Sequence, residues 1–386
     1  MIKFNRVGVV KIAALFFAAS SMLMDACQVP VFRYALERWP ADPYGLAVFH
    51  NGPLTKEQEA VVASVDYDVN LEIFTIDASK MTAPQIARFG KVKISEGQLL
   101  ARLYYPWESG RSESLWEGGL TREMLSRIVN SPVRRRIAKD ILAGESAVWV
   151  ILQSGEIESD NKIEELLNKH LKEISQWLEI PEGVAGPGEL ERVATGEVAM
   201  EDVLRSTIPL KISFSVVKVS MDDPDEEIFI RMLTGFVPEL MEEHPGQPLV
   251  FPVFGRGRAL DGIAAKMLNE ELMASAGSYI CGACSCEVKR ENPGIDLVMS
   301  VQWDDLLEGS AVVIDKLLPP LEGVGDLVAV LPPEFPVAVT VNPAADSKAD
   351  EPAGKSVSLL SVIGVLCGVL VTILIGLTFL MKRRSS

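Results

Sequence analysis

The feature that most restricts how this chain can fold is the apolar run from Ser356 to Met381, in which residues 357–381 carry no charge. At a rise of about 1.5 Å per residue, a helix of this length crosses a hydrocarbon core of about 30 Å. A buried core helix is the alternative, but core helices of this length rarely lack a charge. A basic tail, residues 382–386, follows the run, as is typical of the cytoplasmic end of a span. We therefore expect a single transmembrane helix at residues 356–381.

The N-terminus supports the same topology. Lys3, Arg6 and Lys11 precede a short apolar centre at residues 12–19, and small residues follow it. This order predicts an export signal over residues 1–26. Cleavage after Ala26 would leave a terminal cysteine, as in a lipoprotein, and retention as an N-terminal anchor is a third alternative. The expected location is the cell membrane, with the bulk of the chain extracytoplasmic (periplasmic) and residues 382–386 cytoplasmic.

Length and charge restrict the class of protein further. A chain of 386 residues has room for two ordinary domains and an anchor, and 48% hydrophobic residues indicate a folded chain. The formal net charge of −16 argues against a nucleic-acid partner, because binding to phosphates requires a basic face. The short basic run at residues 134–136 is expected to be a solvated helix start.

The order of apolar patterns predicts two α/β units, residues 27–132 and residues 133–330. In the first, a strand, a capped helix and a second strand imply a right-handed crossover and a parallel pair, followed by a hairpin and a helix. The same order recurs in the second. The strands are expected at 44–50, 69–76, 99–105, 114–117, 147–152, 210–219, 249–254, 258–260 and 296–301, and the helices at 55–65, 121–129, 161–178, 225–233 and 261–274.

This order resembles the thioredoxin-like fold, over residues 44–129 and 147–275. The resemblance implies an α/β protein with two tandem thioredoxin-like units. The family's redox motif, Cys-x-x-Cys after the first strand of the unit, is absent from both. Those positions hold His50-Asn51-Gly52-Pro53 and Gln153-Ser154-Gly155-Glu156, so disulfide exchange is not expected there. Residues 27–54 also resemble the opening of membrane-anchored exported bacterial proteins.

A segment rich in Pro, Ala and Asp, residues 331–355, separates the second unit from the apolar run. Such a composition cannot bury a core and is typical of an extended linker. Within the run, Gly364 and Gly368 form a Gly-x-x-x-Gly motif, which permits close pairing of two transmembrane helices. A homodimer through these glycines is therefore a hypothesis.

The chemically suggestive feature of the sequence is its cysteine cluster. Cys281, Cys284 and Cys286 lie within six residues, Cys27 opens the predicted mature chain, and Cys367 lies inside the apolar run. The four cysteines outside the span form an even set in an oxidising compartment, which favours two disulfides. A thiolate site for zinc or copper(I) is a second interpretation. The third is a redox-active pair, Cys281 and Cys284, with Cys286 as the resolving thiol.

Other candidate sites have weaker support. The three histidines, His50, His170 and His244, match no metal-ligand spacing, and the common nucleophile and phosphate-binding motifs are absent. The acidic run at 222–227 could bind calcium, but it also fits the first turn of a helix. Two functions therefore remain open: a thiol- or metal-handling role at the cysteine cluster, with Cys281 and Cys284 as candidate catalytic residues, or a non-catalytic interaction or scaffold role with structural disulfides.

Overall fold

The structure is a computed structural model of the chain, and it describes residues 27–65, 68–284 and 288–308. These residues all belong to one compact unit, Met1–Asp315. The predicted export signal, linker, transmembrane run and cytoplasmic tail lie outside the described residues, as do Cys286 and Cys367. Within the described ranges, no helix combines the length and the apolar character that a membrane crossing requires.

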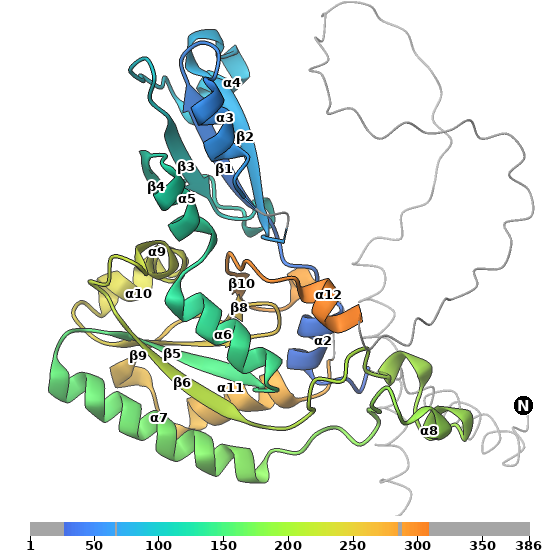
Figure 1. Cartoon of the computed structure of the whole chain (residues 1–386). Helices are drawn as coiled ribbons and strands as arrows, with labels where there is room; N and C mark the ends of the chain where they lie inside the picture. The colour runs from blue at the N-terminus through green and yellow to red at the C-terminus, as the bar shows by residue number, and fades with distance from the viewer. Residues whose placement is uncertain (1–26, 66–67, 285–287, 309–386) are drawn as a thin grey trace, which may run out of the picture. The chain divides into compact units, whose positions relative to one another are not determined.

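The first sheet has four strands in the order β2-β1-β3-β4 (Figure 1). β1 pairs parallel with β2 and antiparallel with β3, and β3 pairs antiparallel with β4. Helix α3 forms the crossover from β1 to β2, and its N-cap Thr55 forms a capping box with Gln58. The elements are β1 (Tyr44–His50), α3 (Lys56–Val62), β2 (Leu71–Asp77), α4 (Ala83–Phe89), β3 (Leu100–Tyr104), the 3₁₀ turn η2 (Trp107–Ser109), β4 (Ser114–Gly119) and α5 (Arg122–Val129).

The second sheet repeats this arrangement with an added edge. Its order is β10-β8-β7-β5-β6, with β5 parallel to β6 and antiparallel to β7, and the short β9 also pairs with β7. The strands are β5 (Ala147–Gln153), β6 (Phe214–Ser220), β7 (Leu249–Phe254), β8 (Arg258–Ala259), β9 (Ile263–Ala264) and β10 (Ile295–Asp296). The helices are α6 (Pro132–Leu142), α7 (Ile157–Trp177), α8 (Leu190–Ala194), α9 (Glu227–Thr234), α10 (Pro238–Glu243), α11 (Glu270–Cys281) and α12 (Trp303–Glu308).

The two predicted α/β units share a continuous hydrophobic core. Successive side chains of β5 point to opposite faces of the sheet, as in any strand. On one face, Val148 and Val150 belong to a core that also includes Leu46 and Val48 of β1. Trp149 and Ile151 face a second core, formed with α7, α11 and the N-terminal segment. Because both faces of β5 are buried, its sequence is an unbroken apolar run rather than an alternating one.

Helix α2 (Val31–Glu37) follows the predicted export signal and is buried along its whole length. The order of polar and apolar residues here is that of an amphipathic helix, yet the polar positions are buried as well. Its two charged residues, Arg33 and Glu37, form a buried ion pair at 2.8 Å. Arg33 also donates to the Ile208 carbonyl, and Glu37 accepts from the Ser206 hydroxyl at 2.9 Å. The loop that contains Ser206 and Ile208 thus supplies hydrogen-bond partners to both members of the ion pair, which allows the pair to be buried.

Several predicted elements differ from the structure. The helix predicted at 261–274 is wrong: β9 and a 3₁₀ turn occupy its first half, and α11 begins only after its N-cap, Asn269. α11 then continues beyond residue 274, where the predicted helix ends, and includes Gly277. The missing side chain of Gly277 leaves room for Ile174 of α7. The strand predicted at 296–301 is reduced to the two residues of β10.

Arg134, predicted to be a solvated residue at a helix start, is instead buried. Its guanidinium donates to the carbonyls of Ile128, Val298 and Arg127. Its neighbour Arg135 is exposed, as predicted. The basic run thus begins a helix, but one of its members connects three segments of the fold.

Candidate functional site

Cys281 is the last residue of α11 and lies fully inside the second core. Its sulfur contacts the side chain of Ser146, which precedes β5, and Ser146 donates to the Lys211 carbonyl at 2.8 Å. Burial raises the pKa of the Cys281 thiol to about 12, an effect that Ser146 only partly offsets. The C-terminal end of a helix disfavours an anion as well. The Cys281 thiol is therefore held neutral in this position.

The chain after Cys281 pairs with the start of the described chain. Val31 donates its amide to the Gly282 carbonyl, and Cys284 donates its amide to the Val29 carbonyl, both at 3.0 Å. Pro30 and Ala283 form an antiparallel bridge between these hydrogen bonds. The Cys284 side chain is buried in the same core as Cys281. This short ribbon joins the N-terminal segment to the end of α11.

Cys27 is the third cysteine of this region, and it belongs to the same core. Burial raises the pKa of its thiol to about 11, and the carboxylate of Asp202, which contacts the sulfur, adds to the effect. Asp202 is itself buried and accepts the Gln28 amide at 2.7 Å. The Cys27 side chain is thus buried, with 7% of it exposed, and the lipoprotein alternative stays a prediction.

The structure therefore brings three of the four predicted cysteines into one core. Among the described residues, Cys27 and Cys281 carry free thiols and no disulfide is present. The same residues contain no group of three or more His, Cys, Asp or Glu side chains arranged to hold a metal ion. Cys286, the fourth member of the predicted set, lies outside the described residues, so the disulfide, zinc and copper(I) interpretations stay predictions.

At the two positions where the resemblance would place a redox motif, backbone amides already donate to carboxylates of the chain itself. Before α7, the buried carboxylate of Asp160 accepts the amides of Ser154 at 2.8 Å and Gly155 at 3.1 Å. After β1, the carboxylate of Asp77 accepts the Gly52 amide at 3.2 Å, and hydrogen bonds, chiefly from the Ser79 hydroxyl, hold its pKa well below the usual range. Backbone amides that could stabilise a thiolate are thus already occupied.

The histidines are not brought together. The His50 ring bonds to the Gly52 carbonyl at 2.7 Å, His170 lies 3.0 Å from Glu173 on α7, and His244 is buried after α10. The His170 side chain is largely shielded from solvent.

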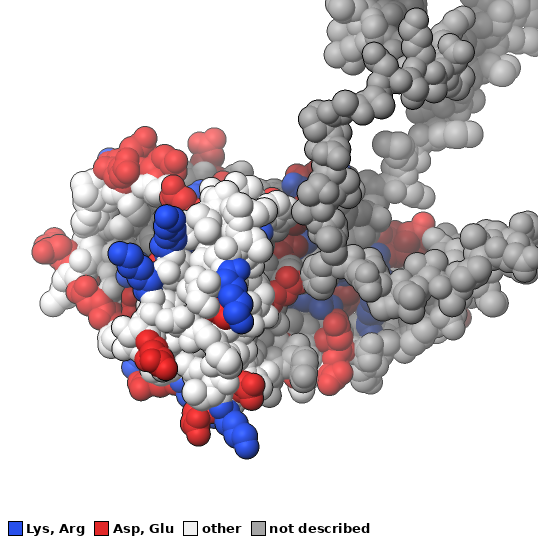
Figure 2. All heavy atoms as spheres, turned by 90° about the horizontal axis from the view of Figure 1, so that it is seen from above, with Lys and Arg blue, Asp and Glu red and all other residues white. Residues whose placement is uncertain are grey.

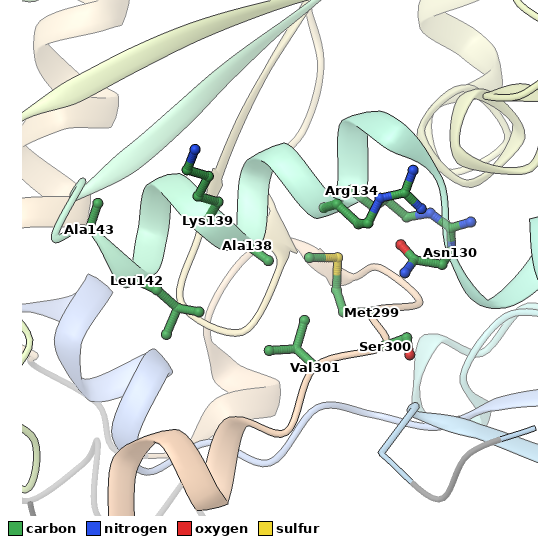
Figure 3. Close-up of a pocket in the computed structure, with 10 residues that line it drawn as sticks. Asn130, Arg134, Ala138, Lys139, Leu142, Ala143, Met299, Ser300 and Val301 are labelled. Atoms are coloured by element: carbon green, nitrogen blue, oxygen red, sulfur yellow. The ribbon is translucent and has the colours of Figure 1, made fainter.

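A cavity of about 490 Å³ lies between α6 and the segment that follows β10. Figure 3 shows Ala138 and Leu142 of α6 facing Met299 and Val301 across it, with the Lys139 amine directed away. None of its ten lining residues is acidic, a cysteine or a histidine. The cavity therefore offers an apolar recess rather than a set of groups for acid–base or nucleophilic chemistry.

Two residues of the cysteine region are missing from the sequence-based expectations. Ser146 lies 135 positions before Cys281 and Asp202 lies 175 positions after Cys27, by their numbers in the chain. Nothing in the local pattern around either residue indicates a sulfur contact.

Searches against protein-family models, curated proteins and solved structures found no match for this chain.

Proposed function

We propose that this chain is a membrane-anchored extracytoplasmic interaction or scaffold protein, built from two thioredoxin-like units, whose cysteines are structural. In this proposal residues 1–26 export the chain, residues 356–381 anchor it, and the short basic tail stays in the cytoplasm. Gly364 and Gly368 offer a route to a homodimer within the membrane.

The thioredoxin-like assignment is supported by strand order. The first sheet has the order β2-β1-β3-β4, and the corresponding strands of the second sheet have the order β6-β5-β7-β8. In each sheet the first two strands in the chain pair parallel, β1 with β2 and β5 with β6, and the other neighbours pair antiparallel. A crossover helix connects the first pair in each sheet, α3 in one and α7 in the other. This is the arrangement that the sequence resemblance implies for both units.

The observation that carries the structural role is the burial of Cys281 at the C-terminal end of α11. A thiol that attacks a disulfide or binds a metal does so as a thiolate. With pKa values raised to about 12 for Cys281 and about 11 for Cys27, the thiolate is scarce at neutral pH. Packed in one core, Cys27 and Cys281 instead help to hold the first described residues against the end of α11.

The test is the reactivity of the thiols in the full-length protein, purified in a mild detergent. We expect Cys281 to resist a thiol-specific reagent at pH 7 and to react only after denaturation. Cys281→Ala and Cys284→Ser are expected to lower the unfolding midpoint, and no dithiol-dependent reductase activity is expected in the unmodified chain.

Two results would favour the thiol- or metal-handling role instead. One is rapid modification of Cys281 or Cys284 in the native chain at pH 7. The other is about one zinc or copper ion per chain that is lost in Cys284→Ser while the unfolding midpoint stays the same. Ser146→Ala is a matched control, because it alters the contact to sulfur and leaves every cysteine in place.

A further inference from the structure

The most exposed large apolar side chain in the described part of the chain is that of Trp107, which is 78% exposed. It lies in η2, the turn that follows β3. The guanidinium carbon of Arg88, on α4, lies 5.0 Å from the centre of its indole ring. Ile86, two residues before Arg88 on α4, is also exposed. A tryptophan beside an arginine at the surface is typical of a binding surface rather than of a solvated turn.

This region carries a charge opposite to that of the whole chain. Residues 78–111 contain six Lys or Arg and two Asp or Glu, although the chain has a formal net charge of −16. Arg88, Lys91 and Lys93 are exposed and have no carboxylate within ion-pair distance among the described residues. One acidic residue, Glu108, lies next to Trp107. The excess of positive charge favours a negatively charged partner.

The end of the described part that carries α3 and α4 has Lys and Arg side chains spread over an otherwise weakly charged surface (Figure 2). Figure 2 looks onto the end of the described part that carries α3 and α4 in Figure 1, and shows separated Lys and Arg side chains on a largely uncharged area, with most Asp and Glu side chains around it. Such a distribution suits a broad anionic surface better than a single small anion.

We propose that this surface, formed by Ile86, Arg88, Lys91, Lys93 and Trp107 and here called the Trp107 surface, docks on an anionic lipid bilayer. Tryptophan favours the level of the headgroups, where its ring is in an apolar setting and its N–H remains hydrated. Lysine and arginine reach the lipid phosphates while their stems cover apolar surface. The inference rests on the proposed membrane anchor, which keeps a bilayer within reach of the described part of the chain.

An acidic protein is the other partner of matching charge. The bilayer is favoured because the Trp107 side chain is 78% exposed and does not line either of the two cavities nearest to it in sequence, where a single peptide could be selected. One of these cavities is lined by residues that include Glu57, Lys93 and Leu99. The other is lined by residues that include Pro106, Glu108 and Ser109, which flank Trp107 in the chain. Neither includes Trp107 among its lining residues.

The experiment uses the full-length chain reconstituted into vesicles whose lipids carry brominated acyl chains, which quench tryptophan fluorescence on contact. Vesicles of phosphatidylcholine alone are compared with vesicles of equal parts phosphatidylcholine and phosphatidylglycerol. We expect extra quenching only in the anionic vesicles, and its loss in Trp107→Phe but not in Trp177→Phe, which removes another exposed tryptophan. High salt should abolish the extra quenching, because it screens surface charge.

Charge variants test the same contact. The double variant Lys91→Gln and Lys93→Gln is expected to lower the ratio of docked to undocked chains by about fivefold per charge. The matched double variant Lys162→Gln and Lys169→Gln, on the exposed side of α7, should leave the ratio unchanged.

Three outcomes would overturn the inference: equal quenching in both vesicle types, quenching that persists in Trp107→Phe, or salt-dependent binding of a soluble acidic polypeptide without any quenching by lipid. A failure of the full-length chain to partition into either vesicle would instead refute the proposed anchor. The failure of the docking and the failure of the anchoring are thus distinguishable.

Discussion

Replacing Arg134 by methionine is expected to destabilise the chain strongly, although the side chain lies far from any proposed binding surface. The guanidinium makes four hydrogen bonds: to the carbonyls of Ile128 and Val298 at 2.9 Å, to the Arg127 carbonyl at 2.6 Å and to the Ser131 hydroxyl at 3.1 Å. These groups belong to the end of α5, the start of α6 and the segment after β10. One side chain therefore connects segments on both sides of the boundary between the two predicted units.

The size of the effect follows from the carbonyls left without a donor. A buried acceptor without a partner costs about 1–3 kcal/mol, and the variant leaves two such carbonyls, those of Ile128 and Val298. The penalty for burying the guanidinium, which lowers the pKa of Arg134 to about 10, is removed at the same time and offsets part of the loss. The buried carboxylate of Glu226 also loses a favourable cation. We expect a net loss of about 3 kcal/mol in the free energy of unfolding.

The assay is urea unfolding of the full-length chain in a mild detergent, followed by tryptophan fluorescence. Arg134→Lys should lose about half as much, because one ammonium cannot reach all four acceptors. The exposed neighbour provides the control: Arg135→Met should change the free energy by less than about 0.5 kcal/mol. If Arg134→Met behaved like Arg135→Met, the hydrogen bonds described for the guanidinium would not contribute to stability and the reasoning would fail.

Three further perturbations test other parts of the fold. Asp160→Ala should destabilise by about 1–2 kcal/mol, because the Ser154 and Gly155 amides lose their acceptor, while Glu158→Ala on the same turn should have little effect in the same urea titration. The free energy of unfolding should fall as pH rises above 9, since the unfolded chain releases the Cys281 proton there while the folded chain holds it until about pH 12. Cys281 alone accounts for at most about 1.4 kcal/mol per pH unit. The fall should be smaller in Cys281→Ala, in which the Cys27 thiol, whose pKa is raised to about 11, still contributes. Gly277→Leu should lower the thermal midpoint and Gly277→Ala much less, because a Cβ at this position would lie 3.2 Å from Ile174 and a larger side chain has no space.

Elements with strong local signals were predictable from the sequence. The run Ala147–Leu152 is apolar without interruption, and β5 occupies it with one further residue. α7 was predicted from the helical spacing of its apolar residues and begins four residues earlier than expected. The missed helix α4 had a readable signal, because Thr82 and Gln85 form a capping box around a proline in its first turn.

The candidate site was less predictable, because it depends on contacts between distant parts of the chain. Asn269 with two following glutamates marked the true start of α11, yet the apolar residues before it favoured an earlier start. That Cys27 and Cys284 share one core depends on the pairing of Val29 with Cys284, between segments far apart in the chain. No local pattern indicated that α2 would be buried, since Arg33 and Glu37 resemble the exposed face of an amphipathic helix.

The ribbon between Val29 and Cys284 also sets an order of events for a newly made chain. The first described residues leave the ribosome early, but their hydrogen-bonding partners are synthesised more than two hundred residues later. Until then α2 has only part of the apolar surface that will enclose it, and contacts between such distant residues form slowly. Local pieces such as the β1–α3–β2 crossover can assemble while synthesis continues, whereas the closing of the second core has to wait until almost all of the described chain exists.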